Sequence, residues 1–152
     1  MGFQDAFVFL VLLYAAVMVH GQPGNVRPRY IHFLNQHVHN GMTKQKCTGY
    51  IGYLKLTEPN SNRCKEINTF IATDGNRVND ICRQAGRRLE NNRDLYESNK
   101  PFPVVTCKLT SGMFHDKCEY RGSESTRRVV IACDQGWPVH YDGDNVVVNG
   151  RK

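Results

Sequence analysis

The chain has 152 residues, with 20 Lys and Arg against 14 Asp and Glu and a formal net charge of +6. This length excludes an assembly of several large domains and fits one domain. The charge favours polyanionic partners such as RNA, DNA, heparan sulfate or bacterial envelopes, without choosing among them.

Residues 1–21 are predicted to be a secretory signal peptide, with the mature domain at 22–152. An uncharged apolar run extends from Ala6 to Val19, which suits the central region of a signal peptide and is short for a membrane span. Asp5 is unusual so close to the start, and we place cleavage after Gly21. An uncleaved N-terminal anchor is the alternative. Residues 22–28 are predicted to form a mobile arm.

The pattern of apolar residues predicts an α+β domain with helices early and strands late. Helical periodicity predicts three helices, at 29–38, 47–56 and 76–85. β-branched and aromatic runs predict strands at 67–72, 104–109, 118–121, 128–133, 139–141 and 146–148. We interpret "RGSES" as a turn between two strands and "GRR" at 86–88 as a solvated loop.

Six cysteines lie beyond the signal peptide, at positions 47, 64, 82, 107, 118 and 133. In an oxidising compartment an even number predicts three disulfides, although the spacing alone leaves 15 connectivities open. No two of these cysteines have the close spacing of a zinc knuckle, so a metal framework is the weaker interpretation.

Two histidines and a lysine form a candidate catalytic set. His37 shares the apolar face of the first predicted helix with Phe33, and a histidine on a buried face needs a hydrogen-bond partner or a functional role. His140 is followed two residues later by Asp142, and strand alternation puts both on one side. With Lys65 they could cleave a phosphodiester without a metal. A base would take the 2′-hydroxyl proton, an acid would protonate the departing oxygen, and a lysine would neutralise the phosphorane.

Six motifs together resemble the ribonuclease A superfamily. In chain order they are "NQHVHNGM", "CKEINTF", "VVTCKL", "CEYR", "VVIAC" and "PVHYD". The match runs from about Tyr30 to Asp142, and "CK-x-x-NTF" between a helical "QH" and "VH-x-D" is highly specific. The set of three disulfides is most similar to the angiogenin branch and its fish relatives. The resemblance implies a secreted endoribonuclease that cleaves single-stranded RNA 3′ to pyrimidines through a 2′,3′-cyclic phosphate, without metal or cofactor.

The resemblance also implies the fold, the disulfide pairing and the catalytic roles. Three helices would pack on a bent antiparallel sheet. The pairing would be Cys47–Cys107, Cys64–Cys118 and Cys82–Cys133. His37 would be the general base, His140 the general acid, and Lys65 the cation that stabilises the transition state.

Five further residues would bind or position the substrate by the same resemblance. Gln36 would donate to a phosphate oxygen, and Asn68 would support the base through its backbone. Thr69 would read the pyrimidine, Tyr141 would pack beside it, and Asp142 would orient the acid.

The chain departs from angiogenins in two places. Gly143 stands where angiogenins carry a glutamine that fills the pyrimidine pocket, so we expect an open pocket; a C-terminal tail that folds back over it is the alternative. The basic cluster between the first two cysteines of angiogenins, which serves nuclear entry, is absent here.

A second class of function stays open, that of a basic ligand or host-defence protein with weak or dispensable catalysis. Its role would be angiogenic or antibacterial, acting on cell or bacterial surfaces. The expected partners are RNA, heparan sulfate, other cell-surface or bacterial polyanions, and cytosolic ribonuclease inhibitor, and the chain is expected to be a monomer.

Overall fold

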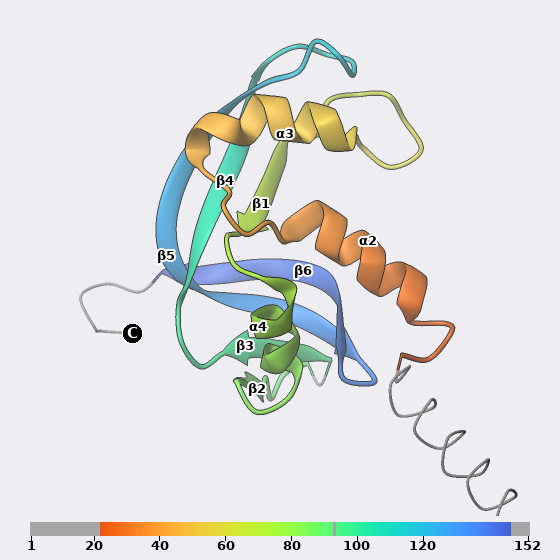
Figure 1. The fold of residues 1–152 in the computed structure, drawn as a ribbon, viewed down its shortest axis with the longest axis vertical. Helices are drawn as coiled ribbons and strands as arrows, with labels where there is room; N and C mark the ends of the chain where they lie inside the picture. Colours follow the sequence, from red (N-terminus) through yellow and green to blue (C-terminus); the bar gives the residue numbers. More distant parts are fainter. Residues whose placement is uncertain (1–21, 93, 147–152) are drawn as a thin grey trace, which may run out of the picture.

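The sheet has six antiparallel strands and forms the centre of the fold in the computed structural model, which describes residues 22–92 and 94–146 (Figure 1). The strands are β1 Ile67–Ile71, β2 Gly86–Arg88, β3 Leu95–Ser98, β4 Phe102–Ser111, β5 Glu119–Asp134 and β6 Trp137–Val146. Their order is β1-β4-β5-β3-β2, and β6 also pairs with β5. β5 is therefore the shared strand, and it bends strongly along its length (Figure 1).

Three helices pack on this sheet: α2 Arg27–His37, α3 Cys47–Leu54 and α4 Gly75–Asn79. α2 contacts β6 and β1, whereas α3 contacts β5. Short 3₁₀ turns precede α3 at Lys44–Lys46 and follow α4 at Asp80–Cys82. The predicted α+β class, with three helices on a bent antiparallel sheet, is confirmed. None of the helices among the described residues is both long and apolar enough to cross a membrane.

Two hydrophobic cores share the strands β1 and β4. Ile71 and Val104 belong to one core, which lies around Phe33 of α2. The neighbouring residues Phe70 and Val105 belong to the other core, which lies under α3. Since successive side chains of a strand point to opposite faces, adjacent residues of the same two strands supply both cores.

The three disulfides have the pairing that the family resemblance implied. They are Cys47–Cys107, Cys64–Cys118 and Cys82–Cys133, with sequence separations of 60, 54 and 51 residues. The first ties α3 to β4, and the third ties the 3₁₀ turn after α4 to β5. In the chain-entropy model, each cross-link that closes a loop of this length lowers the entropy of the unfolded chain and so stabilises the fold by roughly 4 kcal/mol.

The predicted turn "RGSES" is wrong, because β5 runs through it without interruption. Residues Ser123 and Ser125 pair with Thr106 and Val104 of β4. Gly122 marks a close approach between chain segments rather than a turn, since a Cβ there would lie 2.7 Å from the Cys47 sulfur.

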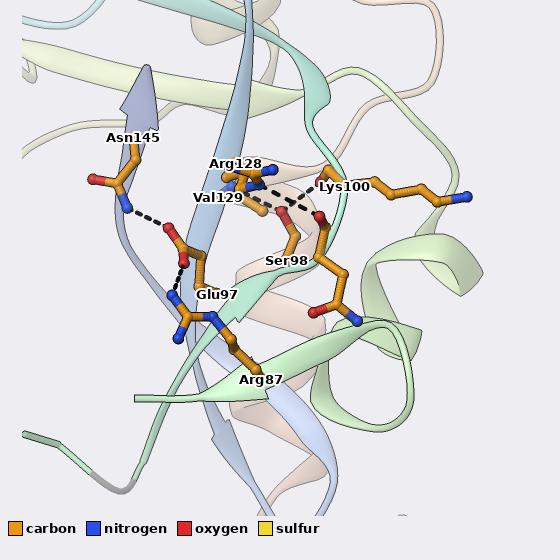
Figure 2. Close-up of polar contacts among 8 residues, drawn as sticks. Arg87, Glu97, Ser98, Lys100, Arg128, Val129 and Asn145 are labelled. Carbon is orange, nitrogen blue, oxygen red and sulfur yellow. Dashed lines mark hydrogen bonds and ion pairs between the residues drawn. The ribbon is translucent and has the colours of Figure 1, made fainter. Parts of the chain in front are cut away.

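Residues 86–88 form strand β2, so their prediction as a loop is also wrong. Arg87 of β2 faces Glu97 of β3 and donates to its carboxylate at 2.9 Å. Asn145 of β6 donates to the other oxygen of Glu97 at 2.5 Å. Figure 2 shows this buried carboxylate between Arg87 and Asn145, where it links the outermost hairpin to the end of β6.

The ends of several elements also differ from prediction. The predicted mobile arm at 22–28 is wrong at its C-terminal end, because α2 already starts at Arg27 and Val26 before it is fully buried. The third predicted helix is the short α4, which ends at Asn79, and a 3₁₀ turn that ends at Cys82 instead of 85, since Arg83 leaves helical backbone angles with φ −128° and ψ −112°. β6 unites two predicted strands as far as Val146. The predicted signal peptide at 1–21 and the tail at 147–152 lie outside the described residues.

Candidate active site

His37 is the last residue of α2, and its ring is held against β1. Its Nδ1 donates to the backbone carbonyl of Thr69 over 2.8 Å. A carbonyl oxygen only accepts, so Nδ1 carries the hydrogen and Nε2 of the neutral ring is left as the acceptor. A bridge between Val38 and Ile71 joins the chain just after α2 to β1, which fixes the position of the ring.

Burial lowers the pKa of His37 from 6.5 to about 4, and the hydrogen bond to Thr69 opposes this shift only in part. The charges of Lys65 and His140 lower the pKa further. His37 is thus neutral at pH 7 and lies within electrostatic reach of both other members of the predicted catalytic set. The structure brings all three residues to one site.

Lys65 is held by a chain of hydrogen bonds that ends on α2. Its Nζ donates to Oδ1 of Asn68 at 2.7 Å, and Nδ2 of Asn68 donates to the backbone carbonyl of Gln36 at 2.9 Å. The hydroxyl of Tyr120 donates to the Lys65 carbonyl at 2.6 Å, and Cys64 anchors the chain on the other side. Burial lowers the pKa of Lys65.

Asn68 therefore contributes differently from what the resemblance implied. The carbonyl that holds His37 belongs to Thr69, whereas Asn68 acts through its buried side chain, which orders the lysine. The backbone carbonyl of Gln36 is engaged in this network, and its side chain is partly exposed.

His140 and Asp142 lie next to each other on β6, as strand alternation predicted. Nε2 of His140 is 3.9 Å from Oδ1 of Asp142, which is an ion-pair contact and too long for a hydrogen bond. The two side chains are 64% and 46% exposed, so the histidine stands at the rim of the site while His37 lies deep in it.

Tyr141 of β6 packs against the ring of His37. Its ring stacks on that of His37, with 5.0 Å between centroids and 23° between planes. Its hydroxyl donates to Asp144, which pairs with Arg127 at 3.0 Å. Burial raises the pKa of the Tyr141 hydroxyl, as does Asp144, and the Thr69 side chain acts in the opposite sense through a hydrogen bond. Tyr141 and Thr69 are therefore neighbours, as expected for two residues of one base pocket.

Asp144 and Arg127 were not anticipated from the sequence. In a regular strand, residues 141 and 144 would face opposite sides. A bulge in β6 places Tyr141 opposite Ile131 but Gly143 opposite Val130, and this extra residue lets Asp144 reach the hydroxyl. A glycine inside a strand, here Gly143, can mark such a bulge in the sequence, but it does not show which side chains the bulge brings together. A Cβ at Gly143 would meet no atom within 4 Å, so the space around it is open.

These residues combine a neutral buried base, a held cation and an exposed histidine, a set suited to proton transfer at a phosphodiester. Within the described part of the chain, no three His, Cys, Asp or Glu side chains are grouped as metal ligands. The family model for pancreatic ribonuclease matches residues 28–142, which include His37, Lys65 and His140. The chain belongs to the pancreatic ribonuclease family.

Relatives of this pancreatic ribonuclease support the same assignment over nearly the whole chain. It is 48% identical to Ribonuclease-like 3 of Danio rerio over 145 residues, which cover 95% of this chain and 97% of that protein. It is 35% identical to Angiogenin of Mus musculus over 142 residues, covering 93% and 96%. The X-ray structure of zebrafish RNase5 superposes with a TM-score of 0.76 at 49% identity, covering 80% of this chain and 98% of that one.

The resemblance to the ribonuclease A superfamily and its angiogenin-like branch is thereby confirmed. This pancreatic ribonuclease is an endoribonuclease, and RNA is its substrate.

Proposed function

We propose that this pancreatic-type ribonuclease is secreted and cleaves single-stranded RNA on the 3′ side of pyrimidines through a 2′,3′-cyclic phosphate. The observation that carries the proposal is the tautomer and charge of His37. Its Nδ1 is engaged by the Thr69 carbonyl and its pKa is lowered to about 4, so Nε2 can accept a proton at neutral pH.

In the first step, Nε2 of His37 takes the proton of the ribose 2′-hydroxyl while the oxygen attacks phosphorus. His140 gives its proton to the departing 5′-oxygen, which leaves as a hydroxyl. Lys65 neutralises the charge that builds up on the phosphorane oxygens, and its hydrogen bond to Asn68 orients the ammonium group before the reaction begins. Water then opens the cyclic phosphate with the two histidines in exchanged roles.

The pyrimidine is proposed to bind between Thr69 and Tyr141. The tyrosine ring is already fixed by its stacking on His37 and by its hydroxyl contact with Asp144, so the pocket wall is ordered before the substrate arrives. Gln36 is proposed to donate to a phosphate oxygen, and Asp142 to keep the His140 ring in place.

The test compares three forms of the refolded 22–152 chain on uridine- and cytidine-containing dinucleotides in the presence of a chelator. The wild type should cleave both, and His37→Ala should lose nearly all activity. His115→Ala is the matched control, because His115 pairs with Asp116 on the loop between β4 and β5, outside the hydrogen bonds that hold His37 and Lys65, and should leave the rate unchanged. Cleavage that requires an added metal, or that continues in His37→Ala, would contradict the mechanism.

A host-defence activity is the second candidate, and an exposed amphipathic loop favours it. Met113 and Phe114 are 56% and 48% exposed, and the guanidinium of Arg63 lies 6.0 Å from the Phe114 ring. Apolar side chains beside cations suit an anionic membrane surface. If this surface kills bacteria, killing should persist in His37→Ala and weaken as salt screens the charges. A folded His37→Ala that no longer kills would mean that killing depends on RNA cleavage.

A further inference from the structure

Three aromatic rings outside the catalytic site form a stack on the surface. The rings of His39 and Tyr50 are 4.1 Å apart with 16° between their planes, and those of Tyr50 and Tyr53 are 6.1 Å apart with 21° between them. Tyr50 and Tyr53 are three residues apart on α3 and so share one face of the helix. His39 follows the end of α2 by two residues. We call these three rings the aromatic ladder.

The aromatic ladder is fixed at its central ring, Tyr50, and exposed at Tyr53. The Tyr50 ring packs against the buried Phe70, at 5.6 Å between centroids. Tyr53 is 78% exposed, more than any other large hydrophobic side chain among the described residues, and it belongs to neither hydrophobic core. Packing against the core therefore accounts for an aromatic residue at Tyr50, but it does not account for one at Tyr53.

A hollow of about 340 Å³ adjoins the aromatic ladder. It is lined on one side by His39 and Tyr50 and on another by Asn35 of α2, the helix that also carries His37. Asp74 is the acidic group of the lining, and it already accepts a hydrogen bond from the Arg77 backbone as the cap of α4. The hollow therefore leaves space beside the rings of His39 and Tyr50.

Lysines precede and follow α3, the helix that carries two of the three rings of the aromatic ladder. Lys44 and Lys46 are exposed in the 3₁₀ turn before α3, and Lys55 is exposed directly after α3. Lys46 donates to the Gly41 carbonyl at 3.0 Å, and together with burial its charge lowers the pKa of His39. The His39 ring thereby offers a neutral aromatic face next to a positive charge.

We propose that the aromatic ladder is an accessory site that stacks the bases of single-stranded RNA outside the catalytic site. The proposal rests on RNA being the substrate and adds a second contact for strands longer than the catalytic site holds. Near-parallel rings, an exposed outer face and flanking lysines match the requirements for binding a single strand, where bases stack on aromatic side chains and lysines meet phosphates. Every base has a flat face, so this site should tolerate any sequence.

The experiment measures binding of a fluorescent 15-nucleotide oligouridine to the full mature chain carrying His37→Ala, which prevents cleavage. Adding Tyr53→Ala should weaken binding roughly ten-fold, since stacking on one aromatic side chain typically contributes that much or more. Tyr53→Phe keeps the ring and should bind as tightly as the parent. Phe114→Ala removes another exposed ring, 48% exposed and outside the aromatic ladder, and is the matched control.

Two further measurements distinguish failure of the accessory site from failure of the proposed function. In the active chain, Tyr53→Ala should leave dinucleotide cleavage unchanged, because a dinucleotide does not need a second contact. Lys46→Ala should reduce the slope of log affinity against log salt by about 0.7, the value for one phosphate contact on a single strand. Unchanged oligouridine binding in Tyr53→Ala, or equal losses in Tyr53→Ala and Phe114→Ala, would overturn the accessory site. Absence of dinucleotide cleavage by the wild type would instead overturn the proposed function.

Discussion

Between pH 7 and pH 4 the wild type should lose about 3 kcal/mol more of its free energy of unfolding than the variant His37→Gln does. In the folded chain the pKa of His37 is lowered to about 4, against 6.5 for an ordinary histidine. Between these values the unfolded chain binds more protons than the folded one, so stability is complete above pH 6.5 and declines as pH falls toward 4. A difference of about 2.5 pKa units corresponds to about 3 kcal/mol at pH 4.

Urea unfolding of the wild type and His37→Gln, each at pH 7 and pH 4, measures this effect. Carboxylates also titrate in this range, but they do so in both proteins and cancel in the comparison. His115→Gln serves as the control for loss of a histidine, and it should lose as much stability as the wild type. If His37→Gln loses as much stability as the wild type, the imidazole is not held neutral by the fold, and the argument for its role as a ready base fails.

Three further predictions concern the reaction. Lys65→Ala should lower kcat by roughly 10²–10³ with little change in KM, because the positive charge is needed most when the phosphorane forms. Lys65→Arg should restore only part of the rate. A raised KM with an unchanged kcat would contradict this role of Lys65. The acidic limb of the kcat/KM profile on dinucleotides should lie below pH 6.5, since His37 loses its proton at about 4; a limb at 6.5 or above would show that the base is not depressed. Gly143→Gln should slow pyrimidine dinucleotide cleavage, since the space at that position is open to a side chain, and it should also lower the urea midpoint, since the backbone φ of +159° is strained for any residue with a side chain; an unchanged rate would place the pocket elsewhere.

Much of the site could be predicted because its signals are local. A histidine among apolar residues on one helical face pointed to His37, and the family resemblance of the "CKEINTF" motif pointed to Lys65. The geometry of Asp144 could not be predicted, because it depends on one extra residue in β6 that changes which side chains share a face. The role of the Asn68 side chain likewise depends on Gln36, which is 32 residues away in the sequence.

The strands that the sequence analysis missed depend on distant partners. β2 is three residues long and contains two arginines, a composition that resembles a loop. It becomes a strand because Arg87 and Arg88 meet Glu97 and the Tyr96 hydroxyl across the hairpin. In β5 the same kind of error occurred, since small polar residues typical of a turn are held in the strand by pairing with β4.

The sharing of β1 and β4 between the two hydrophobic cores has a consequence for how the molecule melts. Phe70 cannot leave one core without loosening Ile71 in the other, and Val104 and Val105 are coupled in the same way. We expect one cooperative transition in calorimetry, with equal calorimetric and van't Hoff enthalpies, instead of two separate events. Thr69, whose carbonyl holds His37, precedes Phe70 directly, so damage to either core should reach the catalytic base.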